Sequence, residues 1–491
     1  MKYNHASKRW QHLAKICALF VAVKIAHFVI IVSTPAQFDV STSILLRSYL
    51  KEKEALASFH TAIPMLNRAL GKITSIVVER FLDRLVTWDA VYFADLFVNG
   101  IQYEHQFVFC PLWWRLVRIL PVNPETEFYS RLFWATFITN MCHLGSALVL
   151  YFYTVEVFGK ARIFSPERMA VAASMLYVCS PAAAFLTAPY SESIAALCSF
   201  LCLFLREISV GQTQLTVGQD GFIPGTDLPP RSLPKDVPGF SLAEKPETTS
   251  KQFQSRPQSR PQSHPQSASL YLHVSSLLKS SNTGIYMLSG AFAALAFGFR
   301  ANCLFLGIIY IYDLCLSRTK SPVLPLAAGS LLGVAFLAIH VHSYVYVCDS
   351  GRGEWCESRL PSLFAYAQSH YWGNGFLKYW TMNNLPNFAF AAPTVVLSAL
   401  AVRYFAQIYP VERILPVLAV NVVFLLSLIL FWHVQIITRI HTFLPVVYWL
   451  MAGLITQPNT SDRKWAKAYV AYFVIWNVLQ PSLFSAFLPP A

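Results

Sequence analysis

Apolar runs long enough to cross a lipid bilayer recur along this chain of 491 residues. A transmembrane helix needs about 20 predominantly apolar residues, and helices and closed barrels are the structures that satisfy their own backbone polar groups in lipid. Hydrophobic residues make up 55% of the sequence and charged residues only 13%, about half the charged share of an average soluble domain. These features exclude a soluble globular enzyme, a fibrous protein and a mostly disordered chain. The sequence therefore predicts an all-α polytopic membrane protein.

We expect about eleven spans. The first is interpreted as a retained span and not a cleaved signal peptide, because no convincing small-residue cleavage site follows it. Lys24 interrupts this span, where it either snorkels or faces the protein interior. The short segments around Pro189 and Arg300 are either spans or re-entrant segments. The predicted spans cover residues 16–32, 131–156, 168–187, 190–207, 283–299, 301–316, 322–346, 388–408, 412–431, 440–456 and 467–487.

Basic residues indicate the orientation of these spans, because short cytosolic loops are enriched in Lys and Arg. If the N-terminus is cytosolic, the short turns on the opposite side contain only Arg300 and Arg439, whereas the cytosolic segments contain many basic residues. The net charge of +13 is therefore attributed to membrane orientation and not to nucleic-acid binding. An odd number of spans places the C-terminus on the far, lumenal side.

The predicted spans divide the chain into three parts. Residues 1–208 form an N-terminal transmembrane part whose first lumenal loop covers about 35–130, and residues 282–491 form a C-terminal transmembrane part with a second lumenal loop at about 347–387. Residues 209–281 are rich in Pro, Gln and Ser, a composition that cannot bury a core, so we expect a disordered cytosolic loop there.

Local features of the loops add further expectations. Apolar residues recur at helical spacing over residues 73–86, with Glu79, Arg80, Asp83 and Arg84 on the other side, which predicts an amphipathic helix at the membrane surface. Cys348 and Cys356 lie in the second lumenal loop, where an oxidising compartment would allow a disulfide, and the spacing leaves open whether they pair. The sequon at Asn459 falls on the cytosolic side and should stay unmodified.

Asp89 is the candidate catalytic acid. Thr87 is expected to cap a helix that Gly100 ends, which places Asp89 in its first turn. A carboxylate there can simply be favoured by the helix dipole. The alternative is a general base that removes the proton of a sugar hydroxyl during inverting glycosyl transfer, and the neighbouring Trp88 suits contact with a sugar.

Polar residues in three more segments fall on the same predicted side. Glu104 and His105 lie among aromatics, either in an interfacial belt or as ligands of an acceptor hydroxyl or a phosphate oxygen. Glu192 opens an apolar helix, as an N-terminal charge or as a group pointing into a cavity. Arg300 either snorkels or clamps a phosphate through its paired donors.

Two C-terminal segments complete the set. Asn374 and Lys378 belong to an aromatic stretch that fits contact with a carbohydrate or a lipid headgroup, although an aromatic girdle explains its Trp and Tyr residues. His433, Gln435 and Arg439 lie at the lumenal end of a span, where a cation either stabilises a departing lipid phosphate or anchors the interface.

These residues carry a resemblance to a known family. The sequence resembles the PIG-V family, the dolichol-phosphate-mannose-dependent mannosyltransferases of glycosylphosphatidylinositol (GPI) assembly. The similar motifs occur in family order from near residue 88 to the C-terminus. They are WDAVYF at 88–93, YEHQFVFCP at 103–111, SPAAAFLTAPYSES at 180–193, FGFRAN at 297–302, YWGNGFLKYWTMNNLPNFAFAAP at 371–393, HVQIITR at 433–439 and FLPP at 487–490.

The resemblance implies a GT-C-type helical bundle with the catalytic acid in the first lumenal loop. It implies dolichyl phosphate β-D-mannose as donor and a one-mannose GPI precursor as acceptor. A second mannose would be added through an α-1,6 link, in the endoplasmic reticulum membrane. No nucleotide sugar, cofactor or metal is implied, in agreement with the absence of a D-x-D motif from the sequence. A small membrane partner subunit is implied for fungal-type members.

The resemblance also assigns residues. Asp89 corresponds to the acid of the family's Trp-Asp pair and is the expected base, with Trp88 orienting the sugar or supporting Asp89. The lesser candidates for acceptor or phosphate binding are Glu104, His105, Glu192, Arg300, Asn374, Lys378, His433, Gln435 and Arg439.

Two other functions remain as alternatives. One is a related lipid-phosphate-sugar-dependent transferase with another acceptor. The other is a polytopic lipid transporter or scramblase, suggested by intramembrane Lys24 and by spans that contain Pro. The sequence shows no inverted repeat and no charged pair deep within the spans, which counts against transport.

Overall fold

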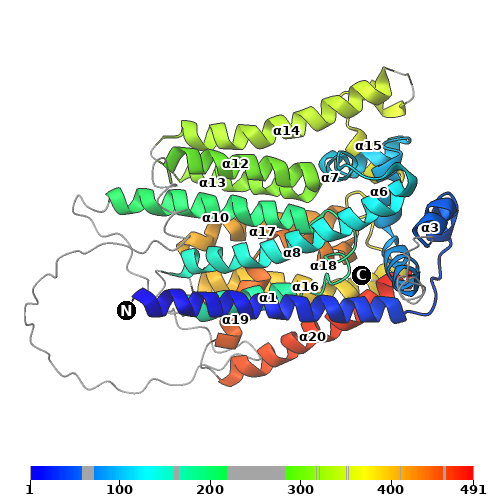
Figure 1. Ribbon diagram of the computed structural model, residues 1–491. Coiled ribbons are helices and arrows are strands. Elements are labelled where there is room, and N and C mark those ends of the chain that lie inside the picture. The colour runs from blue at the N-terminus through cyan, green and yellow to red at the C-terminus, as the bar shows by residue number, and fades with distance from the viewer. Residues whose placement is uncertain are drawn as a thin grey trace, which may run out of the picture.

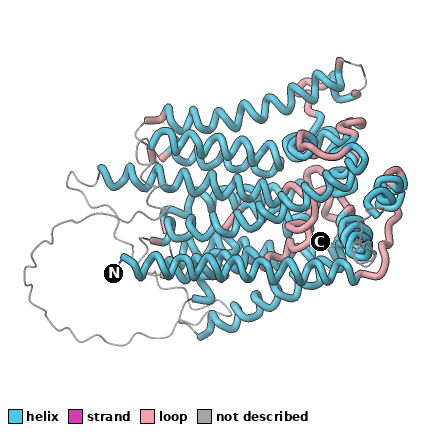
Figure 2. Tube along the Cα trace, in the orientation of Figure 1, coloured by secondary structure: helices cyan, strands magenta, loops and turns pink. Residues whose placement is uncertain are grey.

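The structure is a computed structural model, and the parts of the chain that it describes are helical, with loops gathered at the two ends of a bundle and no strand among the described residues (Figure 2). The described residues are 2–57, 71–159, 165–217, 282–316, 318–319, 321–349, 351, 353–409, 411–456 and 460–489.

Eleven helices lie side by side in the described part of the bundle (Figure 1). The central helix α10 packs against α8 and α12, and α12 packs against α14. The N-terminus lies at one end of the bundle and the C-terminus at the other (Figure 1). These helices are α1 (Lys2–Ser33), α8 (Glu127–Phe158), α9 (Pro166–Val178), α10 (Glu192–Val217), α12 (Asn282–Phe299), α13 (Gly307–Cys315), α14 (Val323–Cys348), α16 (Leu385–Arg403), α17 (Leu415–Phe431), α19 (Val446–Thr456) and α20 (Thr460–Ser485).

These eleven helices correspond one to one with the eleven predicted spans. Seven of the described helices are long and apolar enough to cross a membrane, and an eighth crossing results if the bent pair Val434–Phe443 and Val446–Thr456 counts as one. The other three expected spans, at residues 168–187, 301–316 and 467–487, differ from that pattern. The first is a helix of 13 residues followed by turns, the second joins a 3-10 segment to a helix of nine residues, and the third, α20, does not meet that test of length and apolarity.

Short elements collect where the C-terminus lies, which we call the loop end of the bundle (Figure 1). The first long loop holds α2 (Ser41–Arg47), α3 (Leu50–Ala57), η1 (Ile76–Leu82), α5 (Asp83–Leu85), α6 (Asp89–Val98), η2 (Glu104–Val108), α7 (Pro111–Arg118) and η3 (Pro124–Thr126). The second holds η6 (Glu354–Glu357), α15 (Leu363–His370) and η7 (Met382–Asn384). The remaining short helices are η5 (Ala301–Leu306), η8 (Tyr404–Ile408), η9 (Glu412–Ile414), η10 (Val434–Ile436), α18 (Ile437–Ile440) and η11 (His441–Phe443).

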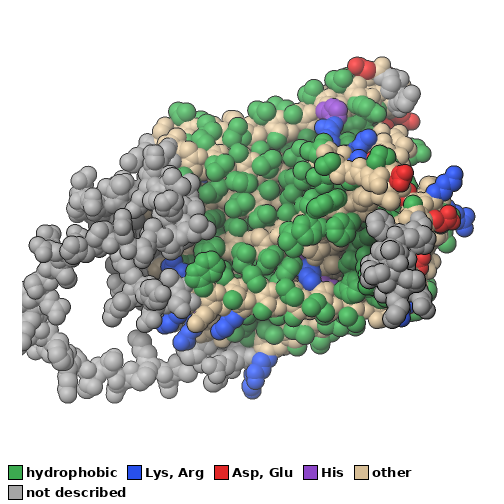
Figure 3. Space-filling view, viewed as in Figure 1, with side chains coloured by type: hydrophobic (Ala, Val, Ile, Leu, Met, Phe, Trp, Pro, Cys, Tyr) green, Lys and Arg blue, Asp and Glu red, His purple; other side chains and the backbone are tan. Residues whose placement is uncertain are grey.

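Hydrophobic side chains cover the middle of the visible face, and the acidic side chains visible there gather at the loop end (Figure 3). This distribution is the one expected of helices that span a bilayer, because lipid tails offer no partner to a charge. The expectation of a polytopic all-α membrane protein is confirmed.

Irregular backbone over residues 179–191 runs inside the bundle. The sequence predicted helix over 168–187 and again from 190, and left open whether the segments around Pro189 are spans or re-entrant. Irregular backbone of this kind is tolerated at membrane depth only when protein groups satisfy it, and side chains from α1, α7, α8 and α20 donate to its carbonyl oxygens. The donor–acceptor pairs are Lys24 to Leu186 at 2.8 Å, Asn140 to Thr187 at 2.9 Å, Trp113 to Pro189 at 3.0 Å and Asn477 to Ser180 at 2.9 Å. Lys24 therefore faces the protein and not the lipid.

Some local predictions are wrong. Over residues 73–86 the chain is helical but includes a π-helical segment, η1, and Asp83, expected on the polar face, is buried with Lys53 at 2.9 Å and Tyr129 at 3.0 Å. Thr87 does not cap α6, because Trp88 occupies the N-cap position with φ 55°.

The predicted disordered loop is only partly described. Helix α10 continues to Val217, past the expected loop start at residue 209. Residues 218–281 and the sequon residue Asn459 lie outside the described residues, so the predictions made for them stay predictions.

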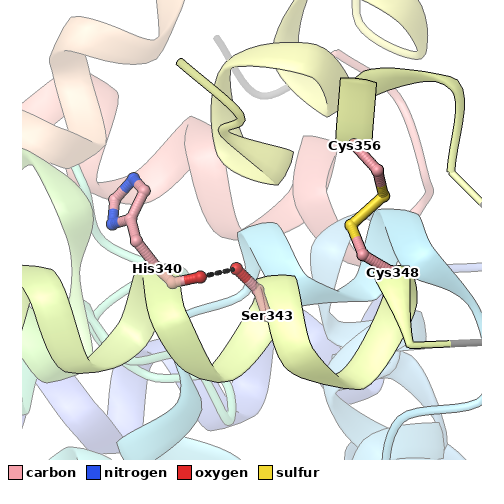
Figure 4. The surroundings of a disulfide bond; sticks show 4 residues. All are labelled: His340, Ser343, Cys348 and Cys356. Atoms are coloured by element: carbon pink, nitrogen blue, oxygen red, sulfur yellow. Dashed lines mark hydrogen bonds between the residues drawn. A yellow bond between two sulfur atoms is a disulfide. The ribbon is translucent and has the colours of Figure 1, made fainter. Parts of the chain in front are cut away.

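Cys348 and Cys356 form a disulfide between the end of α14 and η6 (Figure 4). This pairing answers the question that the spacing left open. Their neighbourhood is a small separate core of Val347, Trp355 and Leu363, against which Phe107 of the first loop packs. The disulfide thus ties η6 to the end of α14, and the packing of Phe107 joins this part of the second loop to the first.

A buried ion cluster joins helices near the opposite, N-terminal end of the bundle. The Arg206 guanidinium donates to both carboxylate oxygens of Asp313, one of them at 2.9 Å, and Tyr286 donates to the same carboxylate at 2.7 Å. Glu207 pairs with Arg206 at 3.1 Å and with Arg413 at 3.3 Å. Burial of charges is tolerated here because each has a hydrogen-bonded partner of opposite sign.

Replacing Asp313 with Asn should lower the free energy of unfolding by roughly 3 kcal/mol, because Arg206 stays buried without its main counter-charge. Thermal unfolding of the detergent-solubilised protein measures this change. The matched control is Glu412→Gln: Glu412 is 78% exposed and pairs with Arg318 at 3.8 Å, so its loss should change the free energy by less than about 0.5 kcal/mol. Equal shifts for the two variants would contradict the assignment.

Candidate active site

A cavity of about 770 Å³ opens among the described residues at the loop end of the bundle. Its wall comes from α6, η2, η5, α14, α15, η10, α18 and the residue Phe487 near the C-terminus. In the described residues no group of three or more His, Cys, Asp or Glu side chains could hold a metal ion. The polar residues of the wall are Ser41, Asp89, Ser191, Arg300, Asn302, His340, Ser343, Gln368, Asn374, His433, Gln435 and Arg439.

Asp89 begins α6 and reaches the cavity wall. One of its oxygens, Oδ2, accepts a hydrogen bond from Nη1 of Arg439 at 2.6 Å. The other oxygen, Oδ1, has no hydrogen-bond partner within the described chain, and 25% of the side chain is exposed. The ion pair therefore fixes the direction of the carboxylate while one oxygen stays available to a ligand.

Arg439 connects Asp89 to a second acid, Glu192. The Glu192 carboxylate is 1% exposed and lies 4.0 Å from Nε of Arg439 and 3.1 Å from Nη2 of Arg300. The Arg439 guanidinium also stacks over the Phe185 ring, 5.2 Å from its centroid. Two acids and two arginines thus form an electroneutral cluster, in which a buried Glu192 orients both cations.

Tyr190 fixes the turn that precedes Asp89. Its hydroxyl donates to the carbonyl oxygen of Thr87 at 3.0 Å and accepts from the backbone N–H of Ala90 at 3.2 Å. Tyr190 belongs to the irregular segment 179–191, so the same segment that Lys24 supports also holds the backbone on both sides of Asp89.

Trp88 has a backbone conformation that is unfavourable for a residue with a Cβ atom, with φ 55°. Its ring lies against Phe487, at 5.2 Å between centroids, and both residues line the cavity. Its Nε1–H is buried and has no hydrogen-bond partner within the described residues. Backbone strain persists only where packing enforces it. At Trp88 the strained backbone comes directly before Asp89, which lines the cavity.

Amide oxygens without partners lie on another part of the wall. Asn374 is held by Gln368, whose carbonyl oxygen accepts its backbone N–H at 2.8 Å and whose side-chain oxygen accepts its Nδ2. In the described part of the chain Oδ1 of Asn374 and Oε1 of Gln435 are buried without a hydrogen-bond partner. Such atoms are acceptors for hydroxyl groups of a ligand.

His433 completes this wall. Its ring stacks on Tyr379 at 4.4 Å between centroids. Burial lowers the pKa of His433, and the charge of Arg439 acts in the same direction. The neutral imidazole is therefore favoured at neutral pH, and His433 offers hydrogen bonding and not a positive charge.

The structure does not bring every predicted residue to the cavity. Glu104 and His105 lie outside its wall, and Glu104 accepts a hydrogen bond from the Tyr371 hydroxyl at 2.6 Å. Lys378 is exposed and does not line the cavity. The expected residues that do line it are Trp88, Asp89, Arg300, Asn374, His433, Gln435 and Arg439, and Glu192 lies behind the two arginines.

Sequence reasoning missed several wall residues. His340 and Ser343 lie on α14, on the same helix as the disulfide residue Cys348 (Figure 4). The sequence did contain a signal for them: two polar residues, three positions apart, lie on one face of an otherwise apolar span. Gln368 of α15 and Tyr190 behind Asp89 carried no such signal, because they are ordinary polar residues until the chain folds.

Comparison with known proteins adds an independent observation. A family model described as mannosyltransferase (PIG-V) matches residues 14–218, 272–414 and 409–491. GPI mannosyltransferase 2 of Candida albicans is 32% identical over 98% of this chain and 100% of its own length, and that of Saccharomyces cerevisiae is 30% identical over 96% and 98%. An Archaeoglobus fulgidus oligosaccharyltransferase crystal structure aligns with 96% of this chain, at 11% identity and a TM-score of 0.43, and this chain covers 55% of that one.

Replacing Tyr190 with Phe should lower the free energy of unfolding by about 1–2 kcal/mol, because its hydroxyl makes two hydrogen bonds and each typically contributes about 1 kcal/mol net. It should also speed hydrogen–deuterium exchange in residues 87–91, because the Thr87 carbonyl keeps only the Ala90 N–H as donor. Tyr312→Phe is the control, since the hydroxyl of Tyr312 has no hydrogen-bond partner in the described residues. Unchanged exchange at residues 87–91 in Tyr190→Phe would show that Tyr190 does not hold this turn.

Proposed function

Because the chain belongs to the PIG-V mannosyltransferase family, we propose that it transfers the second mannose, through an α-1,6 link, from dolichyl phosphate mannose to the one-mannose precursor of a GPI anchor. The family that the motifs predicted is thereby confirmed, and the chain is a multi-pass membrane mannosyltransferase. Relatives named GPI mannosyltransferase 2 cover nearly the whole chain and support the choice of acceptor.

One observation carries the chemical part of the proposal: a single carboxylate, that of Asp89, lines the large cavity with one oxygen unpaired in the described chain. In the proposed step Asp89 takes the proton from the acceptor hydroxyl as the hydroxyl oxygen attacks C1 of mannose. The new O–C1 bond forms as the bond between C1 and the phosphate oxygen breaks, and the electron pair leaves with dolichyl phosphate. One base on the side opposite the leaving group converts the β-linked donor into an α-linked product.

Arg300 is proposed to stabilise the phosphate that departs, and Arg439 to hold the Asp89 carboxylate in place. Both line the cavity, and both are held in place by Glu192 on the side away from it. Fixed cations that face developing negative charge lower the barrier because they need no reorganisation during the reaction. Asn374, Gln435 and the neutral His433 are proposed to bind sugar hydroxyls.

The cavity is proposed to face the lumen of the endoplasmic reticulum. Cys348 and Cys356 form their disulfide at the loop end, and disulfides persist in oxidising compartments. Trp88, Asp89 and Arg439 lie at the same end of the bundle. The charge bias of the short loops supports the same orientation.

The proposal includes a small membrane partner subunit, as the sequence resemblance implies. Co-purification from native membranes in mild detergent tests the partner subunit separately. It shows whether a second subunit is bound, whereas the transfer assay below identifies the acceptor. A related transferase with another acceptor is the alternative that the assays below must exclude.

Replacing Asp89 with Asn should reduce kcat for mannosyl transfer by about 10²–10⁴-fold, because the amide keeps the shape of the carboxylate but cannot accept the proton. The assay uses purified protein, dolichyl phosphate mannose and GPI lipids that carry one or two mannoses. Wild type should extend only the one-mannose lipid.

Asp95→Asn is the matched control for Asp89→Asn. Asp95 lies on the same helix, accepts from Asn99 and Gln106 and does not line the cavity. Its replacement should leave kcat within a few-fold of wild type. Full activity of a normally folded Asp89→Asn protein would refute the assignment of the base.

A new glycosylation sequon reports the orientation. The double substitution Ser358→Asn and Leu360→Thr creates Asn-Arg-Thr in the exposed second loop, and Leu360 is 89% exposed. It should add one endoglycosidase-sensitive glycan. Thr319→Asn creates a sequon at the other end of the bundle and should add none. The reverse result would place the cavity on the cytosolic side.

A further inference from the structure

Six aromatic rings from the two long loops form a continuous surface beside the cavity, which we call the aromatic shelf. It consists of Tyr92, Tyr103, His105, Phe109, Tyr371 and Trp372. The ring of His105 is central: it stacks with Tyr103 at 5.7 Å and contacts Tyr371 at 5.4 Å and Tyr92 at 5.6 Å. None of the contacts used above to describe catalysis involves Tyr103, His105 or Tyr371.

The shelf extends the cavity outward. Tyr92, Phe109 and Trp372 line the cavity, whereas Tyr103 and Tyr371 lie beyond its wall. Tyr103 is 60% exposed and Tyr371 46% exposed. A ligand that enters the cavity from the loop end would therefore leave its outer part against exposed ring surfaces.

The shelf is built on a fixed backbone. Gln106 is buried, and its side-chain oxygen accepts the backbone N–H groups of Gln102 at 2.8 Å and Tyr103 at 3.1 Å. Its side-chain nitrogen donates to Asp95 at 3.0 Å. Packing of Phe107 against the small core beside the disulfide holds this segment to the second loop. Surfaces that are preorganised in this way lose little entropy when a ligand binds.

A carboxylate lies within the shelf. Glu104 accepts from the Tyr371 hydroxyl through Oε1, which leaves Oε2 free of recorded partners in the described chain. The hydrogen bond to Glu104 raises the pKa of Tyr371 to about 12, so the hydroxyl stays a donor at physiological pH. A negative charge at this position repels an anionic headgroup and accepts hydrogen bonds from hydroxyl or ammonium groups.

We propose that the aromatic shelf is a binding subsite for the sugars of the acceptor that adjoin the one receiving mannose, with the ring faces stacking on pyranose rings and Glu104 accepting their polar hydrogens. The inference rests on the proposed function, since it needs a glycan acceptor. A membrane-interface belt would require rings facing lipid, whereas one of these rings, Tyr371, donates to a carboxylate and three others line the reaction cavity. The expected ligand class is a neutral or amine-bearing hexose.

The test compares two acceptors, the full one-mannose GPI lipid and a short α-mannoside that lacks the neighbouring sugars. Tyr103→Ala and Tyr371→Ala should each raise KM for the full lipid about tenfold, since one exposed ring contact is lost, and change kcat less than threefold. KM for the short acceptor should not change. Tyr371→Phe keeps the ring and should stay within threefold of wild type for both acceptors.

Phe38→Ala is the control, because Phe38 is 75% exposed in the first long loop and lies outside the shelf and the cavity. It should leave both KM values unchanged. Tyr103 is the most exposed ring of the shelf, so Tyr103→Ala should fold. It therefore gives a KM value for the test even if Tyr371→Ala fails to fold. An unchanged KM for the full lipid, or equal rises for both acceptors, would overturn the proposal. Failure of the proposed function itself would differ, because wild type would then mannosylate neither acceptor.

Discussion

The ion pair between Arg439 and Asp89 joins residues 350 positions apart and determines where the candidate reaction centre lies. A carboxylate at the first turn of α6 would point in any direction that its rotamers allow. The guanidinium at 2.6 Å selects one direction, and Glu192 behind it keeps the guanidinium in place. The four charges of Asp89, Glu192, Arg300 and Arg439 balance, which makes burial of Glu192 tolerable in a membrane protein.

This arrangement depends on a stretch of irregular backbone in the middle of the bundle. Residues 179–191 leave helical structure, and their carbonyl oxygens would be unsatisfied in lipid. Lys24, Asn140 and other side chains from four helices satisfy them, so Tyr190 and Glu192 approach Asp89 on a rigid support. An intramembrane lysine that first suggested transport thus has a structural partner, which removes one motive for that alternative.

The sequence predicted which charged residues line the cavity better than how they are arranged. Arg300 and Arg439 stood out because charged residues at the ends of apolar spans are costly, and Asp89 because it lies in the first turn of a helix beside Trp88; each of them lines the cavity. The positions of the bundle segments followed from apolar runs, although only seven of the described helices, or eight crossings with the bent pair, are long and apolar enough to span a membrane. Glu104 and His105 were grouped with Asp89 because they lie in the same loop, but Gln106 turns that segment so that both lie on the aromatic shelf outside the cavity wall.

Other features could not be predicted because they depend on contacts between distant segments. The left-handed backbone of Trp88 depends on packing against Phe487 and on Tyr190 holding Thr87, and capping statistics favoured Thr87 instead. Asp83 was assigned to the exposed side of an amphipathic helix, but Lys53 and Tyr129 give it buried partners. The disulfide was an open question for a different reason: Cys348 and Cys356 are only eight residues apart, and spacing alone does not fix the local backbone geometry that lets two cysteines pair.

The most direct measurement is a cryo-electron microscopy map of the enzyme bound to dolichyl phosphate and the one-mannose GPI lipid. The central claim requires the Asp89 carboxylate within about 2.6–3.2 Å of the acceptor hydroxyl that is to receive mannose, with the phosphate near Arg300 and across the sugar site from Asp89. A map in which that hydroxyl contacts Glu104 or Glu192 instead, or in which the Asp89 carboxylate faces away from the cavity, would contradict it.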